Sequence, residues 1–246
     1  MSGRVEWLEP EWPVPGRVRV VSTLRGGGSS AGPYASLNLA AHVGDDQACV
    51  NENRRRLREA AGMPGEPLWL EQVHGSGVVA HTGQAGVPRA DAAIATGPGR
   101  VCAVMTADCL PVVLADRAGT RVAVAHAGWR GLAGGVVEAT VSAMGGDPAE
   151  LMAWLGPAIG QGAFEVGPEV RQAFVERSSA ADAFFATNHR DRFEADLHGL
   201  ARLVLRTAGV PAVFGGGWCT ATDPARFFSF RRDGVTGRMA TLAWLE

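Results

Sequence analysis

Two histidines and one cysteine occur in similar sequence surroundings, and their side chains together could bind a metal ion. His74, Cys109 and His126 each follow an apolar stretch typical of a strand, with glycine or proline within the next two residues. Loops at strand ends of a rigid scaffold commonly carry reactive side chains. Two imidazoles and a thiolate leave the fourth position of a tetrahedral zinc ion open, as in catalytic zinc sites, whereas structural sites close all four positions.

The same residues allow other interpretations. Spacings of 35 and 17 residues are too wide for a zinc finger or knuckle. Cys109 could instead be a nucleophile with His126 as its base. A single buried cysteine usually behaves as a small hydrophobe, and a single histidine is usually an ordinary hydrogen-bonded group. The spacing alone therefore leaves a metal site, a nucleophile pair and a structural role open.

Composition excludes several classes of function. The chain has 246 residues, of which 46% are hydrophobic, and its net charge is −2, so we expect one domain with a large core and no nucleic-acid partner. No apolar run approaches the 18 or more residues of a membrane span. The N-terminal stretch carries acids and prolines where a secretory signal would be apolar. We expect a cytoplasmic protein without a membrane partner.

The chain contains no lysine, so all 23 of its basic residues are arginine. Schiff-base catalysis, attachment of pyridoxal phosphate and a Walker-type phosphate lysine all need an amine that is missing here. Any phosphate must therefore be held by arginine, by backbone N–H groups or by a metal.

Helix and strand patterns alternate irregularly along the chain, which predicts a single α+β domain over residues 1–246 with helices covering the sheets. Asp45 or Asp46 could cap the first helix. The predicted helices span 47–63, 132–144, a segment from about 168, and 193–209. The main predicted strands lie near 17–23, 67–73, 101–109, 111–116, 121–127, 211–220 and 238–245.

Six long motifs resemble the YfiH family of laccase-domain proteins, regarded as zinc-dependent purine nucleoside phosphorylases. They are TLRGGGSSAGPYASLNLAAHVGDD, LEQVHG, MTADCLPVVLAD, AHAGWRGLAGGVVEAT, LGPAIGQGAFEVGPEV and FFSFRRDGVTGRMATLAW, in family order from about Arg17 onward. The resemblance implies a layered α/β/β/α sandwich with mixed sheets, similar to the toxin cysteine deamidases. It also implies zinc ligands at His74, Cys109 and His126.

The resemblance further implies an activity. Family members are expected to cleave adenosine, inosine, guanosine and S-methyl-5′-thioadenosine with phosphate, and to deaminate adenosine at the same zinc site. Polyphenol oxidation with copper is an older family label, and a Cys109–His126 amidohydrolase in peptidoglycan peptide editing is another suggested role. A metal-binding protein without catalysis is a third class. We expect purine nucleoside and phosphate as partners, and a monomer.

The number of histidines argues against the multicopper oxidase. Its copper centres need on the order of ten histidines. This chain has six, at positions 42, 74, 81, 126, 189 and 198, and no His-x-His pair. The His₂Cys set could hold one copper ion in vitro if copper were supplied.

A few further residues are candidates for binding substrate or for transferring protons. By family position Arg54 is the leading candidate for binding phosphate. The alternative is that Arg54 is a solvent-exposed surface residue beside Arg55, Arg56 and Arg58. Arg130 could add a second guanidinium or fix its turn. Ser36 and Asn38 have groups suited to ribose or phosphate, or to closing their own loop. Asp108 is the acid nearest to Cys109 in sequence, although a turn is needed to bring both side chains to one site.

Overall fold

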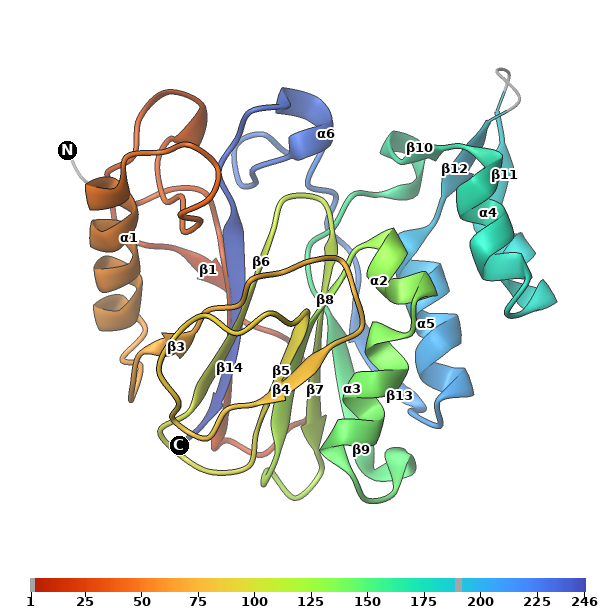
Figure 1. The fold of residues 1–246 in the computed structure, drawn as a ribbon, viewed down its shortest axis with the longest axis horizontal. Coiled ribbons are helices and arrows are strands. Elements are labelled where there is room, and N and C mark those ends of the chain that lie inside the picture. The colour runs from red at the N-terminus through yellow and green to blue at the C-terminus, as the bar shows by residue number, and fades with distance from the viewer. Residues whose placement is uncertain (1–2, 189–191) are drawn as a thin grey trace.

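The computed structural model describes residues 3–188 and 192–246, and its centre is a pair of β-sheets (Figure 1). The strand orders are β1-β2-β14-β6-β3 and β13-β9-β7-β8-β5-β4. In the first sheet the bounds are Trp7–Leu8, Val18–Thr23, Met239–Leu245, Val101–Thr106 and Pro67–Leu68. In the second they are Ala212–Gly215, Leu151–Leu155, Leu110–Asp116, Val122–Ala127, Ala92–Ala95 and Val78–Ala80.

A small third sheet and the helices surround this pair. The third sheet has the order β10-β12-β11, with bounds Glu165–Val166, Phe193–Ala195 and Phe185–Thr187. The α-helices α1 to α6 are Gln47–Ala60, Trp129–Ala133, Val136–Met144, Pro168–Val175, Leu197–Thr207 and Phe230–Asp233. Short 3₁₀ helices are Gly32–Tyr34, Pro148–Glu150, Gln161–Ala163 and Ser179–Phe184.

Three apolar clusters hold the layers together. Leu57 of α1 packs with Ala103 and Met105 of β6 on the outer face of the five-stranded sheet. On the other side, Val141 of α3 and Leu205 of α5 belong to the cluster that covers the six-stranded sheet. Val and Ala side chains of both sheets fill the space between them. The predicted α/β/β/α sandwich is confirmed (Figure 1).

Alternation along the strands assigns each side chain to a layer, because neighbouring residues of a strand point to opposite faces. In β8, Val122 and Val124 pack between the sheets, whereas Ala123 and Ala125 face the helices. His126 has the same parity as Val122 and Val124. The histidine therefore lies where the space between the two sheets ends.

The N-terminal and C-terminal parts of the chain complete the five-stranded sheet. Strand β14 pairs antiparallel with β2 on one side and with β6 on the other, so that Thr241 lies opposite Ser22 and Val104. The Ser22 and Thr241 hydroxyls are 2.9 Å apart and buried. Strand β6, which leads to Cys109, is thus held by residues more than 100 positions away in sequence.

Several predicted elements are confirmed, and others differ in detail. The helix expected over 193–209 begins only at Leu197, because Phe193–Ala195 forms strand β12. Helix α1 begins after Asp46, whose side chain accepts a hydrogen bond from the amide of Ala48 at 2.7 Å. Strands β7 and β8 form the predicted antiparallel hairpin. The helix expected over 132–144 is instead two helices, because the chain breaks at Gly134 and Gly135, where Gly135 has a left-handed φ of 91°.

Candidate metal centre

His126 is the most deeply buried of the three predicted ligands, with 3% of its surface exposed. It lies inside the end of β8, opposite Pro111 of β7 and within the strand predicted near 121–127. Its Nδ1 is 2.9 Å from a carboxylate oxygen of Asp91, and its backbone amide donates to the carbonyl of Asp91 at 2.7 Å. Because Nδ1 is engaged, Nε2 is the nitrogen left to bind a metal.

Cys109 lies in the turn between β6 and β7. The preceding residue, Asp108, has a φ of 95°, which an L-residue adopts only where its surroundings enforce it. Its two carboxylate oxygens accept hydrogen bonds from the Thr220 hydroxyl at 2.6 Å and from the Arg231 amide at 2.7 Å. These bonds fix the turn that aims Cys109. A catalytic role for Asp108 stays a prediction.

His74 is carried by a loop, because the strand predicted near 67–73 is only two residues long and β3 ends at Leu68. Two side chains hold this loop instead. Gln72 bonds both backbone groups of Met105 in β6, at 2.7 and 2.8 Å. Asp91 accepts hydrogen bonds from the amides of Val73, His74 and Gly75, at 3.2, 2.9 and 2.7 Å. These bonds stabilise the left-handed φ of 59° at His74.

The three side chains converge. One ligand atom from each of His74, Cys109 and His126 lies within 4.8 Å of the others. Cys109 Sγ is 3.9 Å from His74 Nε2. A tetrahedral zinc ion would place such a sulfur and nitrogen about 3.6 Å apart, from ordinary Zn–S and Zn–N bond lengths. The donor set and its spacing therefore fit a metal ion with three protein ligands.

Gly128 makes room for this convergence. A Cβ atom at residue 128 would lie 2.8 Å from Cys109 Sγ and 3.2 Å from Cδ2 of His74. The backbone there has an ordinary extended conformation, with φ −61° and ψ 160°. The glycine is thus required by the close approach of the ligands and not by the backbone geometry.

Electrostatics favour a thiolate in this cluster. Burial raises the pKa of Cys109, but the charge and hydrogen bond of His126, with the hydrogen bond of His74, outweigh it and lower the pKa below its ordinary value. Burial lowers the pKa of His126, whereas Cys109 and Asp91 raise it, and the net shift is upward. Burial also opposes ionisation of Asp91, yet its hydrogen bonds with His126 and Gly75 lower its pKa overall.

A cavity of ≈ 260 Å³ opens onto the cluster. Of the three ligands, His74 is exposed, Cys109 is half-buried and His126 is buried. All three line the cavity, so the open side of the cluster faces this space. The other lining residues are His42, Gln72, Met105, Thr106, Ala107, Phe230 and Arg238. An adjoining groove of ≈ 420 Å³ shares His42, Gln72 and Met105 with the cavity and is also lined by Arg54.

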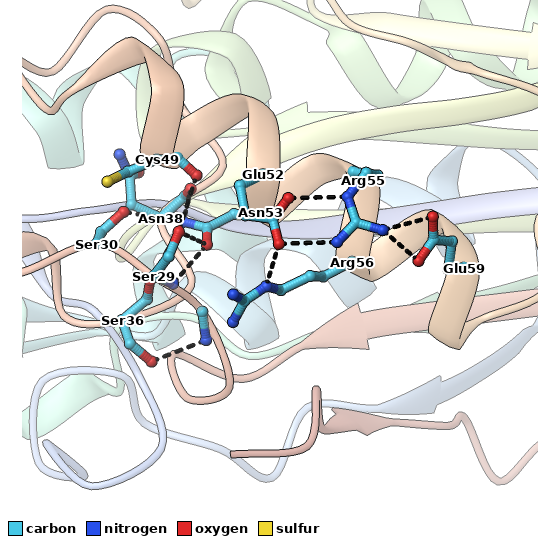
Figure 2. A network of polar contacts seen from close by, with 11 residues as sticks. Ser29, Ser30, Ser36, Asn38, Cys49, Glu52, Asn53, Arg55, Arg56 and Glu59 are labelled. Atoms are coloured by element: carbon cyan, nitrogen blue, oxygen red, sulfur yellow. Dashed lines mark hydrogen bonds and ion pairs between the residues drawn. The ribbon is translucent and has the colours of Figure 1, made fainter. Parts of the chain in front are cut away.

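Arg54 differs from the other arginines of α1. Figure 2 shows Arg55 and Arg56 paired with Glu52, and Arg55 also with Glu59. Arg54 forms no ion pair with any residue of the described ranges. Its Nε donates to the Leu39 carbonyl at 2.9 Å, and its guanidinium lies 4.1 Å from the centre of the Trp69 ring.

The predicted ribose or phosphate ligands Ser36 and Asn38 belong to a hydrogen-bonded loop (Figure 2). The Ser36 hydroxyl accepts from the Gly28 amide at 3.0 Å. The Asn38 amide nitrogen donates to the Ala40 carbonyl at 3.1 Å and to Asp45 at 2.9 Å. Asn38 is fully buried, which agrees with the loop-closing alternative. Their contact with substrate stays a prediction.

The structure does not bring Arg130 to the cavity. Arg130 lies on α2, is exposed, and has its guanidinium 4.3 Å from the ring centre of Trp129. It does not line the cavity or the adjoining groove. A direct role in phosphate binding would need the side chain to move.

Two residues of the site, Asp91 and Arg238, were not predicted from the sequence. Asp91 is fully buried and precedes β5 in the stretch RADAAIA, where an acid before an apolar strand was the available signal. Arg238 lies within the quoted motif GVTGRMAT and precedes β14. Neither residue is close in sequence to a metal ligand, so only the folded chain associates them with the site.

Comparisons with known proteins agree with this architecture. Residues 19–246 match the family model described as "Multi-copper polyphenol oxidoreductase laccase". The chain is 55% identical over 241 residues to a purine nucleoside phosphorylase of Pseudomonas aeruginosa, covering 98% of each protein. It is 54% identical over 239 residues to the purine nucleoside phosphorylase YfiH of Escherichia coli K12, covering 97% of this chain and 98% of that one.

Solved structures of similar proteins have the same fold. A Neisseria meningitidis protein of family DUF152 has a TM-score of 0.95 at 49% identity, with 98% of this chain and 99% of that chain covered. YlmD from Geobacillus stearothermophilus has a TM-score of 0.92 at 32% identity, covering 98% and 96%. Within the described residues, no helix has both the length and the apolar character needed to cross a membrane.

Proposed function

The chain belongs to the YfiH family of laccase-domain proteins, and we propose that it is a zinc-dependent purine nucleoside phosphorylase. The observation that carries the proposal is the convergence of His74, Cys109 and His126 beside an open cavity. The proposed substrates are adenosine, inosine, guanosine and S-methyl-5′-thioadenosine, with adenosine deamination at the same site. We keep the predictions of a cytoplasmic monomer.

Phosphorolysis breaks the N-glycosidic bond and joins C1′ of the ribose to a phosphate oxygen, while the leaving purine takes up a proton. Zinc held by the three side chains would supply Lewis-acid activation. The protein's own contribution is to bind and orient the reactants. Arg54 is the proposed phosphate ligand, with Arg130, Ser36 and Asn38 as further candidates for binding phosphate or ribose.

Asp91 orients the ligands in this proposal. Its carboxylate holds Nδ1 of His126 and the backbone of the His74 loop. A carboxylate that binds the ring nitrogen not used for the metal fixes the ring orientation of a metal-binding histidine. Asp108, whose carboxylate bonds Thr220 and the amide of Arg231, stays a candidate for proton transfer.

A second candidate reaction uses the same residues without metal. Cys109 Sγ lies within 4.8 Å of a ring nitrogen of His126, and Nδ1 of His126 is 2.9 Å from the Asp91 carboxylate. The pKa of Cys109 is lowered by His126 despite its burial. A cysteine, a base and an orienting carboxylate are the parts of a nucleophilic hydrolase. This geometry supports the amidohydrolase alternative, in which an amide of a peptidoglycan peptide is the substrate.

The polyphenol oxidase alternative has less support. In the described ranges, His74, Cys109 and His126 form the one cluster of three or more side chains suited to a metal. A multicopper oxidase needs additional copper centres and more histidines than the six in this chain. A single copper ion at the His₂Cys site is the most that this arrangement could hold.

The test is to incubate the purified protein with adenosine and phosphate and to separate the products, with Cys109→Ala run in parallel. Adenine and ribose 1-phosphate from the wild type alone are the expected result. Inosine without adenine would assign deamination as the main reaction. Turnover of an amide that survives removal of metal by a chelator, and is lost on thiol alkylation, would favour the hydrolase.

A further inference from the structure

Arg238 lies beside the proposed metal centre and precedes β14. Its side chain lines the same cavity as His74, Cys109 and His126 and is half-buried. Among the described residues no carboxylate is close enough to form an ion pair with it. The negative charges of Cys109 and Asp108 act on this guanidinium, but without a carboxylate in ion-pair contact its free N–H groups can still bind an anion.

The guanidinium is held in place but keeps donors free. Its Nη1 donates to the carbonyls of Thr236 and Gly237, at 2.9 and 3.0 Å. Its centre lies 5.7 Å from the centre of the Phe230 ring. Its Nε and Nη2 form no hydrogen bond with the part of the chain that the structure describes. The Nε–Nη2 edge of the guanidinium therefore has free N–H groups for a ligand in the cavity.

The backbone at Arg238 is fixed by the loop that contains Asn38. The amide of Arg238 donates to Oδ1 of the buried Asn38 at 2.9 Å, and the amide of Leu39 donates back to the Arg238 carbonyl at 3.3 Å. Asn38 is in turn held by Asn53 of α1, whose side chain donates to its carbonyl at 2.9 Å. The arginine is thus positioned before any ligand binds, which reduces the entropy lost on binding.

Arg54 and Arg238 line two adjoining spaces that share His42. Arg54 lines the adjoining groove, Arg238 lines the metal cavity, and His42 lines both. The pKa of His42 is lowered by burial and then by the positive charges of Arg238 and Arg54. Both arginines therefore contribute positive charge near His42, which a bound anion would offset.

We propose that Arg238 is the inner phosphate-binding residue of the metal cavity, and that phosphate binds between Arg238 and Arg54 next to His42. The proposal rests on the proposed phosphorylase function and names the residue that presents phosphate to a nucleoside at the metal centre. In a chain without lysine, two guanidiniums supply the positive charge that phosphate requires. Arg238 takes the place of Arg130 as the second guanidinium.

The test is isothermal titration of the zinc-loaded protein with inorganic phosphate, comparing the wild type with Arg238→Gln. Loss of a charged bidentate contact is expected to weaken phosphate binding about 10- to 100-fold. Arg55→Gln is the matched control, because Arg55 is exposed one residue from Arg54 and is paired with Glu52 and Glu59. It should bind phosphate like the wild type.

Zinc content and the unfolding midpoint of each variant verify that it is folded. If Arg238→Gln does not fold, Arg238→Lys serves instead, since it keeps the charge and loses the fork of donors. Phosphate binding about 10-fold weaker in the lysine variant would support the proposal. Unchanged phosphate binding in a folded variant would overturn it, as would a loss in Arg130→Gln with none in Arg238→Gln.

Steady-state kinetics separate this inference from the proposed function. The KM for phosphate should rise in Arg238→Gln while the KM for adenosine changes little. Nucleoside cleavage with an unaltered KM for phosphate would refute the role of Arg238 and leave the phosphorylase standing. Phosphate binding that depends on Arg238, without any nucleoside cleavage, would keep the binding site and refute the phosphorylase.

Discussion

One carboxylate oxygen of Asp91 lies 2.9 Å from Nδ1 of His126 and also accepts the amide of His74 at 2.9 Å. A single buried side chain thus orients the ring of one predicted ligand and the backbone of another. The two histidines are 52 positions apart in sequence, and Asp91 connects their two segments beside Cys109.

Asp91→Asn should weaken zinc binding about 10- to 100-fold, as is typical for loss of the partner of a metal-binding histidine. The amide keeps the size of the carboxylate but lacks the charge and cannot accept at both oxygens. A competition titration with a chromophoric chelator measures the effect. Asp116→Asn is the matched control, because Asp116 is also buried but lies at the end of β7, next to the β7–β8 turn. Equal zinc affinity in the wild type and Asp91→Asn would contradict the assigned role.

Gly128→Ala should reduce zinc affinity while leaving the fold intact. The added methyl would be 2.8 Å from Cys109 Sγ, so the thiolate must move, whereas the backbone conformation suits alanine. The same titration and a thermal unfolding curve measure the two effects separately. Gly97→Ala, where a Cβ atom meets nothing within 4 Å, should change neither. Unaltered zinc affinity in Gly128→Ala would show that the ligands do not need this close approach.

Asn53→Ala should destabilise the protein by about 3 kcal/mol, because several buried partners lose their hydrogen bonds together. The Asn53 amide nitrogen donates to the Ser30 hydroxyl and to the carbonyls of Ser36 and Asn38, and its oxygen accepts from Ser29 (Figure 2). A lower urea midpoint with an unchanged m-value is the expected measurement. Asn51→Ala, exposed on the same helix, should shift the midpoint only slightly.

Asp116→Asn should make stability less sensitive to acid. Burial raises the pKa of Asp116, but hydrogen bonds from Thr120 and Arg121 outweigh it and lower the pKa from 3.8. A depressed pKa stabilises the fold above the unfolded value, and this contribution is lost as pH falls through the folded pKa. The variant should be about 2 kcal/mol less stable at pH 7, with a difference that shrinks below about pH 4.

Urea unfolding at a series of pH values measures this prediction. Asp182→Asn, with an exposed carboxylate, is the control and should stay close to the wild type throughout. A stability difference that stayed constant from pH 7 to pH 3 would mean that the contribution of Asp116 does not depend on its charge.

Local patterns in the sequence were sufficient for much of the fold. Apolar periodicity and the cap at Asp46 predicted α1, and apolar runs around the turn at Asp116 predicted the β7–β8 hairpin. The metal ligands were inferred from three similar local contexts and from the family motifs. The prediction of one helix over 132–144 was wrong. The apolar residues keep a helical period across Gly134 and Gly135, but the left-handed backbone of Gly135 interrupts the helix there.

The sequence by itself determined which residues could bind a metal, that no lysine can hold a phosphate, and where most of the strands and helices lie. These properties depend on residue type and on neighbours along the chain. Only the tertiary structure decided that Asp91 links His74 to His126, and that Arg238 lies in the cavity while Arg130 does not. Those relationships come from strand pairing and loop packing between distant segments, and no local periodicity records them.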